Sequence, residues 1–166
     1  MTPFSLGAEV GALLKERGET IGVSESSAGG LINAALVAVP GASAYYIGGG
    51  VIYTKMSRDR LLGISDAEMK GMRSASEPYA KLAAKRIREK LGTTWGLSET
   101  GASGPTGNRY GDKAGHACIA VSGPVEAVIT VETGSAEREA NMWVFTRAAL
   151  NLFEACLRDA QTPRRI

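Results

Sequence analysis

The sequence predicts an α/β protein: a three-layer α/β/α sandwich whose sheet is largely parallel and includes one hairpin. Short apolar segments alternate along the chain with longer segments of helical periodicity, which is typical of this class. A Gly-Pro pair at 123–124 separates two apolar runs, residues 117–122 and 125–132, and predicts the hairpin. For 166 residues we expect a single domain over residues 1–160 and a frayed tail over 161–166.

The first half of the chain is expected to contain two helices and two strands. Leucine and valine recur at helical spacing before Gly18, a residue type that commonly follows a helix end. A second helix, of small residues, is ended by Pro40-Gly41, and a strand follows the glycine run 48–50. The expected bounds are residues 5–17 (helix), 19–23 (strand), 29–39 (helix) and 51–53 (strand).

The second half is expected to be mostly helical, with one further strand before the hairpin. Ser65 suits a helix cap, and Pro78 suits the first turn of a helix. A strand then leads into a long polar loop, and a long helix follows the hairpin. The expected bounds are residues 57–62, 65–71, 77–91 and 136–158 for the helices, 94–99 for the strand and 100–115 for the loop.

Composition narrows the classes of function. The 19 basic and 17 acidic residues give a formal net charge of +2, and aromatic residues are not interleaved with the basic ones, so we expect no nucleic-acid role. His116 is the only histidine, which argues against a zinc site and weakens any Ser-His-Asp triad. Cys118 and Cys156 lie in apolar segments and are expected to be small buried hydrophobes. No run reaches transmembrane length, so we expect a cytoplasmic protein with no membrane partner. We also expect no metal and no cofactor.

The most informative segment is the polar turn 23–30, where three hydroxyls and a carboxylate come before a glycine pair. It lies between an expected strand and an expected helix, and unpaired N–H groups at a helix start attract anions. Gly29 and Gly30 would let a ligand approach the main chain, and Ser26 could act as a nucleophile beside a base. The alternative is a helix cap without chemistry, because Ser, Thr and Asp open many helices.

A second polar loop, residues 100–108, follows the strand expected at 94–99, where α/β proteins place their ligands. Its glycine spacing fits neither a dinucleotide fingerprint nor a Walker A loop. A nest of N–H groups lined by Thr100, Ser103 and Thr106 could still hold a phosphate. The alternative is an ordinary turn-rich connection.

Tyr53, Lys55 and Arg58 follow the strand expected at 51–53. Alternation along a strand would place Tyr53 and Lys55 on one face. If that face meets the serine turn, a desolvated lysine could activate a serine without histidine. The alternative is that Lys55 and Arg58 face water, as such side chains commonly do. Glu25 either orients Lys55 or caps a helix.

In their order and spacing, these segments resemble the CinA C-terminal domain family, the nicotinamide-mononucleotide amidohydrolases, over nearly the whole chain. The family's Glu-Ser-Cys-Thr-Gly-Gly signature is similar to Glu25-Ser26-Ser27-Ala28-Gly29-Gly30. The other similar segments are Gly49 to Thr54, Leu62 to Ile64, Ala75 to Glu77, and Thr100 to Asn108, with Gly115 before the following strand. The resemblance implies an α/β/α sandwich that hydrolyses the carboxamide of a small nucleotide, nicotinamide mononucleotide, to the acid and ammonia, in a chain that forms a homo-oligomer.

The resemblance also implies roles for individual residues. Ser26 would be the nucleophile and form an acyl-enzyme, assisted by Tyr53 and by a lysine from the second-strand region. The glycine-rich loops would hold the ribose phosphate and stabilise the oxyanion through N–H groups. The residues implied to contact substrate are Glu25, Ser27, Gly29, Gly30, Thr100, Gly101, Ser103, Gly104 and Arg138.

The chain departs from the family pattern at the catalytic lysine, whose position is occupied by Arg58. Arginine stays protonated in proteins and cannot act as a general base, so Lys55 is the candidate replacement. Ser27-Ala28 stands where the family has Cys-Thr. The family's last loop carries an arginine that this chain lacks there, and Arg138 is the nearest residue that could bind the phosphate in its place. The rival hypothesis is a non-catalytic nucleotide-binding homologue without the base. A scaffold role in DNA uptake or damage response follows only from the family's naming.

Overall fold

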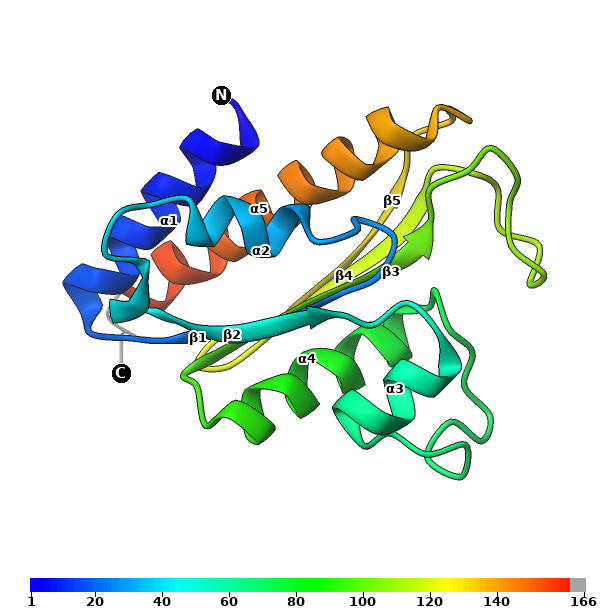
Figure 1. Ribbon diagram of the computed structural model, residues 1–166, viewed down its shortest axis with the longest axis horizontal. Helices are drawn as coiled ribbons and strands as arrows, with labels where there is room; N and C mark the ends of the chain where they lie inside the picture. The colour runs from blue at the N-terminus through cyan, green and yellow to red at the C-terminus, as the bar shows by residue number, and fades with distance from the viewer. Residues whose placement is uncertain (162–166) are drawn as a thin grey trace.

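A five-stranded sheet lies between two layers of helices, as the alternating sequence pattern predicts (Figure 1). The computed structural model describes residues 1–161. Three helices cover one face of the sheet: α1 (Pro3–Arg17), α2 (Leu31–Val37) and α5 (Arg138–Gln161). On the opposite side lie α3 (Lys55–Leu62) and α4 (Glu77–Leu91). The predicted three-layer sandwich is confirmed.

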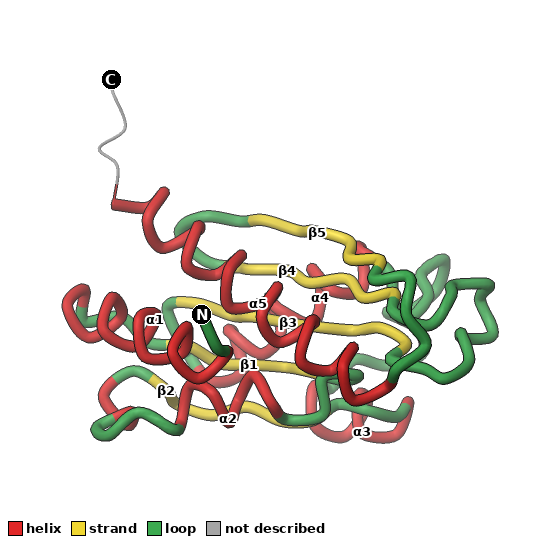
Figure 2. Tube along the Cα trace, turned by 90° about the horizontal axis from the view of Figure 1, so that it is seen from above, coloured by secondary structure: helices red, strands yellow, loops and turns green. Residues whose placement is uncertain are grey.

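The sheet is mixed, with one strand running against the others among the described residues. The strands are β1 (Ile21–Glu25), β2 (Tyr46–Val51), β3 (Trp95–Ala102), β4 (His116–Ser122) and β5 (Ala127–Glu132), and a short 3-10 helix, η1 (Ala42–Ala44), comes before β2. Their order across the sheet is β2-β1-β3-β4-β5 (Figure 2). β1 pairs in parallel with β2 and β3, whereas β4 pairs antiparallel with β3 and β5. The predicted β4–β5 hairpin is therefore present, and the β3–β4 pairing is antiparallel as well.

The larger core lies between the sheet and the α1, α2 and α5 layer. Every residue of β1, which lies between β2 and β3, is buried. The rings of Trp95 and Phe153 meet edge to face, with centroids 5.5 Å apart. Cys118 and Cys156 are both free and buried, as predicted. Within residues 1–161, no helix combines the length and the apolar character needed to cross a membrane.

The second strand and the helix after it lie earlier in the chain than predicted. β2 ends at Val51, so the predicted strand 51–53 is wrong at its carboxyl end. Thr54 caps α3 through its side chain, and Ser57 bonds back to the Thr54 backbone, so this capping box starts the helix at Lys55. Tyr53 and Lys55 therefore do not share a strand face, because one lies in the connection and the other in a helix.

Other predicted boundaries need correction. The predicted helix 65–71 is a series of turns, closed by reciprocal bonds between Ser65 and Glu68. β1 starts two residues later than predicted, at Ile21, and α5 starts at Arg138. The helix predicted at 77–91 is confirmed at both ends, with Ser76 as its N-cap. α5 still includes Gln161, the first residue of the predicted frayed tail, and residues 162–166 lie outside the described part of the chain.

Candidate functional site

The strand order creates a natural ligand position between β1 and β3. From β1 the chain passes through α2, on one face of the sheet, to β2, which is one neighbour of β1. It then passes through α4, on the other face, to β3, which is the other neighbour of β1. The connections that leave β1 and β3 therefore diverge at their carboxyl ends, and ligands of α/β proteins bind in such a crevice. A cleft of about 720 Å³ lies at this end of the sheet. It is lined by Ser26, Ile52, Tyr53, Thr54, Lys55, Arg58, Asp66, Met69, Met72, Arg73, Ser74, Ala75, Tyr79, Thr100, Gly101, Asn108, Arg109 and Tyr110.

Two buried glutamates shape the turn that carries Ser26. Glu25, at the end of β1, accepts hydrogen bonds from the N–H groups of Gly30 (2.7 Å), Ile32 (3.2 Å) and Asn33 (2.8 Å). Its carboxylate thus satisfies the first turn of α2, which is the capping role that the sequence left open. Burial raises the pKa of Glu25, and these bonds oppose that rise.

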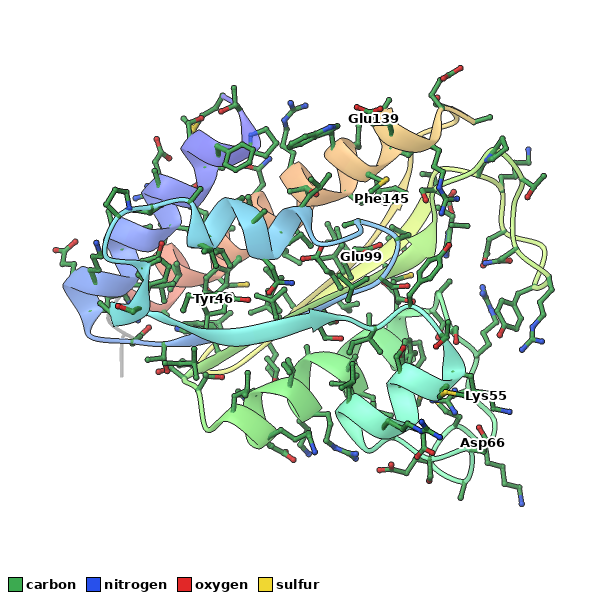
Figure 3. The ribbon with its side chains drawn as sticks, viewed as in Figure 1. Tyr46, Lys55, Asp66, Glu99, Glu139 and Phe145 are labelled. Atoms are coloured by element: carbon green, nitrogen blue, oxygen red, sulfur yellow. The ribbon has the colours of Figure 1, made fainter. Side chains whose placement is uncertain are left out.

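Glu99, on β3, holds the serine turn from the other side. Its Oε2 accepts hydrogen bonds from the N–H groups of Ser26 (3.0 Å) and Ala28 (2.9 Å), and its Oε1 bonds the Ser27 hydroxyl. Complete burial raises the pKa of Glu99 to about 7, against the effect of these bonds, and the nearby Glu25 carboxylate adds to the rise. Figure 3 shows Glu99 inside the molecule, between the sheet and the connection after β1. Glu99 was not predicted as a site residue, because the pattern of residues 94–99 indicates only a strand.

The carboxylates occupy the N–H groups that the sequence analysis reserved for an anion. Glu25 takes those of the α2 start, and Glu99 takes those of Ser26 and Ala28. Gly29 (φ +72°) and Gly30 (φ +104°) make the turn possible but do not line the cleft: a Cβ on Gly29 would lie 2.5 Å from Met142. The turn is therefore closed by the protein's own carboxylates, and Gly29 and Gly30, which were predicted to contact substrate, lie outside the cleft lining.

The side chain of Ser26 faces the cleft, whereas the neighbouring hydroxyl does not. Ser26 is partly exposed and lines the cavity, and among residues 1–161 its hydroxyl has no hydrogen-bond partner. Ser27 is buried and bonded to Glu99. The backbone N–H of Ser27 is the one such donor in residues 26–30 that meets no acceptor within the described chain.

The three side chains predicted to assist Ser26 all line the cleft, but each has another partner. The Lys55 amine lies 3.0 Å from Asp66, and both side chains are about two-thirds exposed, at 68% and 67% (Figure 3). Arg58 is buried and bonds Asp66 (2.6 Å) and the Ile64 carbonyl (3.2 Å). The Tyr53 hydroxyl accepts a bond from Arg138 (2.9 Å). Lys55 is thus not desolvated, which was the condition for its use as a base.

The residues predicted in the second loop divide into two groups. Thr100 and Gly101 belong to the end of β3 and line the cleft, where the Thr100 hydroxyl accepts a bond from the Ala75 N–H (3.1 Å). Ser103 and Gly104 lie against the start of α5 instead. Their carbonyls accept bonds from Asn141 (2.9 Å) and Arg138 (2.5 Å) respectively. Arg138 therefore joins this loop to Tyr53 rather than lining the cleft itself.

Cations that the sequence analysis did not select give the cleft its charge. Arg73 and Arg109 add two guanidinium groups to the charges of Lys55 and Arg58, against the single carboxylate of Asp66 in the lining. Arg73 pairs with Asp112 through bonds of 2.5 and 3.1 Å. Both arginines lie near the Tyr110 ring, at 5.3 and 5.1 Å from its centroid, and the Arg109 bond lowers the pKa of Tyr110. An Arg-Tyr pair directly after the loop 100–108 was the sequence signal for this region.

The fold is a doubly wound α/β/α sandwich, and a serine turn and a cation-rich cleft lie at the ends of β1 and β3, where the connections diverge. These features define the class as α/β proteins that bind a ligand at the carboxyl ends of their strands. A family model of the CinA C-terminal domain matches residues 4–157. The chain belongs to the CinA C-terminal domain family, and the resemblance seen in its motifs is confirmed.

Relatives and solved structures agree with this assignment. A CinA-like protein of Prochlorococcus marinus is 39% identical over 120 residues, which are 72% of this chain and 28% of that protein. A CinA-like protein of Gloeobacter violaceus is 37% identical over 151 residues, 89% of this chain and 35% of that protein. The chain thus spans about a third of the length of these curated relatives. A CinA superfamily protein of Klebsiella pneumoniae matches the fold with a TM-score of 0.89 at 22% identity, over 96% of this chain and 99% of that chain.

Proposed function

We propose that this chain binds a phosphorylated amide of the nicotinamide mononucleotide type in the cleft and hydrolyses its carboxamide through Ser26. The observation that carries the proposal is the Ser26 hydroxyl, which has no hydrogen-bond partner within residues 1–161, in a cleft whose lining has four cationic side chains and one carboxylate. An excess of positive charge suits the phosphate of a nucleotide. One guanidinium group can donate to two phosphate oxygens at once, and Arg109 and Arg73 are our candidates for binding the phosphate in this way.

The proposed chemistry is acyl transfer in two steps. Ser26 Oγ attacks the carboxamide carbon, the C–N bond breaks, and ammonia leaves with the proton that the serine gives up. Water then attacks the resulting ester, releasing the carboxylic acid and restoring the serine. Among the predicted assistants, Tyr53 is the one not bonded to Asp66, so we assign it the transfer of the proton to the leaving nitrogen.

The oxyanion of the tetrahedral intermediate needs donors that the turn has not already used. The Ser27 N–H is such a donor, and it belongs to the residue directly after the proposed nucleophile. In α/β hydrolases with a nucleophile on a strand-to-helix turn, the same position supplies one oxyanion donor. The Ser27 N–H is therefore our candidate for this role.

The test is ammonia release from nicotinamide mononucleotide, measured together with binding of the nucleotide by calorimetry. We expect release from the wild-type chain and a loss of at least about 10³-fold in Ser26→Ala, since the nucleophile is removed while the cations that bind phosphate remain. Ser24→Ala is the matched control, because Ser24 is a buried serine of β1, the strand directly before the serine turn, and lies outside the cleft. Equal turnover in Ser26→Ala and the wild type would overturn the proposed nucleophile.

A second candidate, nucleotide binding without turnover, is favoured by the contacts of Lys55 and Arg58. Asp66 holds both cations, and Arg58 in the family's lysine position cannot accept a proton. This candidate predicts that the wild type binds the nucleotide and releases no ammonia.

The substitution Arg58→Lys separates the two candidates further. If the absence of the family lysine removes the base, Arg58→Lys is expected to raise ammonia release at least tenfold, because a buried lysine can lose its proton. Arg60→Lys, the same change at an exposed position of α3, is the control and should leave the rate unchanged. No gain in Arg58→Lys would contradict the idea that position 58 alone limits turnover.

A further inference from the structure

Ala75 adopts a backbone conformation that alanine disfavours, and it does so in the wall of the cleft. Its φ is +54°, and it is the one described residue other than glycine with a positive φ. A Cβ makes this left-handed region unfavourable, so the surrounding structure must hold the residue there. Ala75 is buried, lines the cleft and comes directly before Ser76, the N-cap of α4.

The peptide groups on both sides of Ala75 are held by side chains. Its N–H donates to the Thr100 hydroxyl on the cleft floor (3.1 Å). Its carbonyl accepts from His116 Nε2 (2.7 Å) and, at a longer distance, from Arg73 (3.4 Å). The shortest of these bonds is the one from His116, a buried side chain at the start of β4.

The surroundings of His116 favour a proton on both ring nitrogens. A carbonyl oxygen only accepts, so Nε2 must donate to Ala75, while Nδ1 lies 2.5 Å from the Glu132 carboxylate on β5. The other charged or titratable groups near the ring are Asp112, 3.6 Å from Nε2 and paired with Arg73, and the Cys118 thiol at 3.8 Å. Burial lowers the pKa of His116, but the bonds to Glu132 and Ala75 and the charge of Asp112 outweigh it, so that the pKa lies above its usual value.

We propose that His116 is a positioning residue of the cleft: its imidazolium holds the strained Ala75 peptide in the shape that lines the ligand site. The proposal rests on the proposed function for the identity of the ligand, but not for the contact itself. When the ring gives up one proton, the remaining one stays on Nδ1, beside the Glu132 carboxylate. Nε2 then presents a lone pair to the Ala75 carbonyl, and the bond between them breaks.

The pH dependence follows from the direction of the shift. A histidine whose pKa is raised by folding stabilises its contact fully below the unfolded value near 6.5, and that contribution disappears as pH rises through the folded pKa. We therefore expect the wall at Ala75 to loosen, and the affinity for nicotinamide mononucleotide to fall, toward alkaline pH.

The test is amide hydrogen exchange at Ala75 between pH 5.5 and 8.5, corrected for the intrinsic rate, with nucleotide affinity measured in parallel. We expect protection in the wild type to fall at least tenfold across the His116 titration. In Glu132→Gln the side-chain amide can donate to Nδ1 and leave the proton on Nε2, so protection should stay high at alkaline pH. Glu132 has a side chain 59% exposed, so this variant should fold. Glu126→Gln, at an exposed residue just before β5, is the matched control.

Two further variants sharpen the result. His116→Ala, which has no donor for the Ala75 carbonyl, should lose the protection at every pH, and adding Ala75→Gly should restore nucleotide affinity, because glycine adopts a positive φ without strain. The proposal is overturned if protection at Ala75 follows the same pH profile in Glu132→Gln as in the wild type. If that profile changes as expected while no nucleotide binds, the positioning role stands and the proposed function fails.

Discussion

Glu99→Ala is expected to lower the free energy of unfolding by at least about 3 kcal/mol at neutral pH. The substitution leaves the N–H groups of Ser26 and Ala28 and the Ser27 hydroxyl without their acceptor. Each buried donor without a partner costs about 1–3 kcal/mol. Urea unfolding of the wild type and the variant measures the difference. The serine turn should also lose its fixed shape, so any turnover through Ser26 should fall with it.

The effect of Glu99 on stability should depend on pH in a defined direction. Folding raises its pKa from 4.5 to about 7, so the fold favours the neutral acid. The stabilising contribution of Glu99 to the free energy of unfolding is fully present below about pH 4.5. It is lost as pH rises through 7, by up to about 3 kcal/mol at 1.36 kcal/mol per pKa unit. Above pH 7 the ionised carboxylate remains in a fully buried position beside Glu25, at that cost.

Glu99→Gln provides the decisive comparison, because glutamine reproduces the neutral acid. Its carbonyl oxygen can accept from Ser26 and Ala28, and its amide can donate to the Ser27 hydroxyl. We expect the variant to match the wild type at pH 5 and to be more stable than the wild type above pH 8. Glu126→Gln changes an exposed carboxylate, and its stability relative to the wild type should not depend on pH in this way. If the free energies of unfolding of wild type and Glu99→Gln change with pH in the same way across pH 5–8.5, the assignment of a raised pKa is contradicted.

The two glutamates also explain why the sequence identified the serine turn but not its use. The pattern of residues 23–30 shows N–H groups at a helix start, and such groups attract anions. The anions turn out to be Glu25, from the turn itself, and Glu99, from a strand 73 positions after Ser26. Periodicity cannot predict that partnership, because it depends on β1 and β3 being neighbours in the sheet.

The position of Lys55 was misjudged for a local reason. A strand through residue 53 would have placed Tyr53 and Lys55 side by side, but the Thr54–Ser57 capping box begins a helix at Lys55. The helix directs the amine to Asp66, away from the partly buried position that a base needs. The capping pattern was visible in the sequence, and a search for it before the strand was extended would have separated Tyr53 from Lys55.

Secondary structure could be predicted where local residues mark both ends of an element, as in α4. Pro78 in the first turn, Ser76 before it and Gly92 after it give both ends of this helix. The cationic cleft could not be predicted in the same way, because its charges come from separate connections. Arg58 lies in α3, Arg73 precedes α4, and Arg109 lies in the loop between β3 and β4. Only the fold brings them together, so the site depends on how α4 packs on the sheet.

Gly96→Ala tests that dependence and is the second change expected to have a large effect. Gly96 lies on β3 directly beneath α4, where an added Cβ would overlap the Ala84 carbonyl oxygen and lie 2.9 Å from Arg88 Cβ. Backbone atoms of a helix cannot rotate away as a side chain can, so α4 must move. We expect a loss of about 3 kcal/mol in the free energy of unfolding, the upper end of the usual cost of overpacking, or failure to fold. Gly48→Ala is the matched control, since its Cβ would meet Leu91 at an ordinary 3.6 Å.

A displaced α4 should also weaken the cleft, because the helix begins directly after Ala75 and its cap. If Gly96→Ala folds, its affinity for nicotinamide mononucleotide should fall while that of Gly48→Ala stays near the wild-type value. Urea unfolding and calorimetry on the same preparations measure both effects. Equal stability of the two alanine variants would show that α4 does not pack on β3 as closely as the structure has it. Lower stability with unchanged affinity would show that the cleft wall is held by Thr100 and His116 independently of the helix behind it.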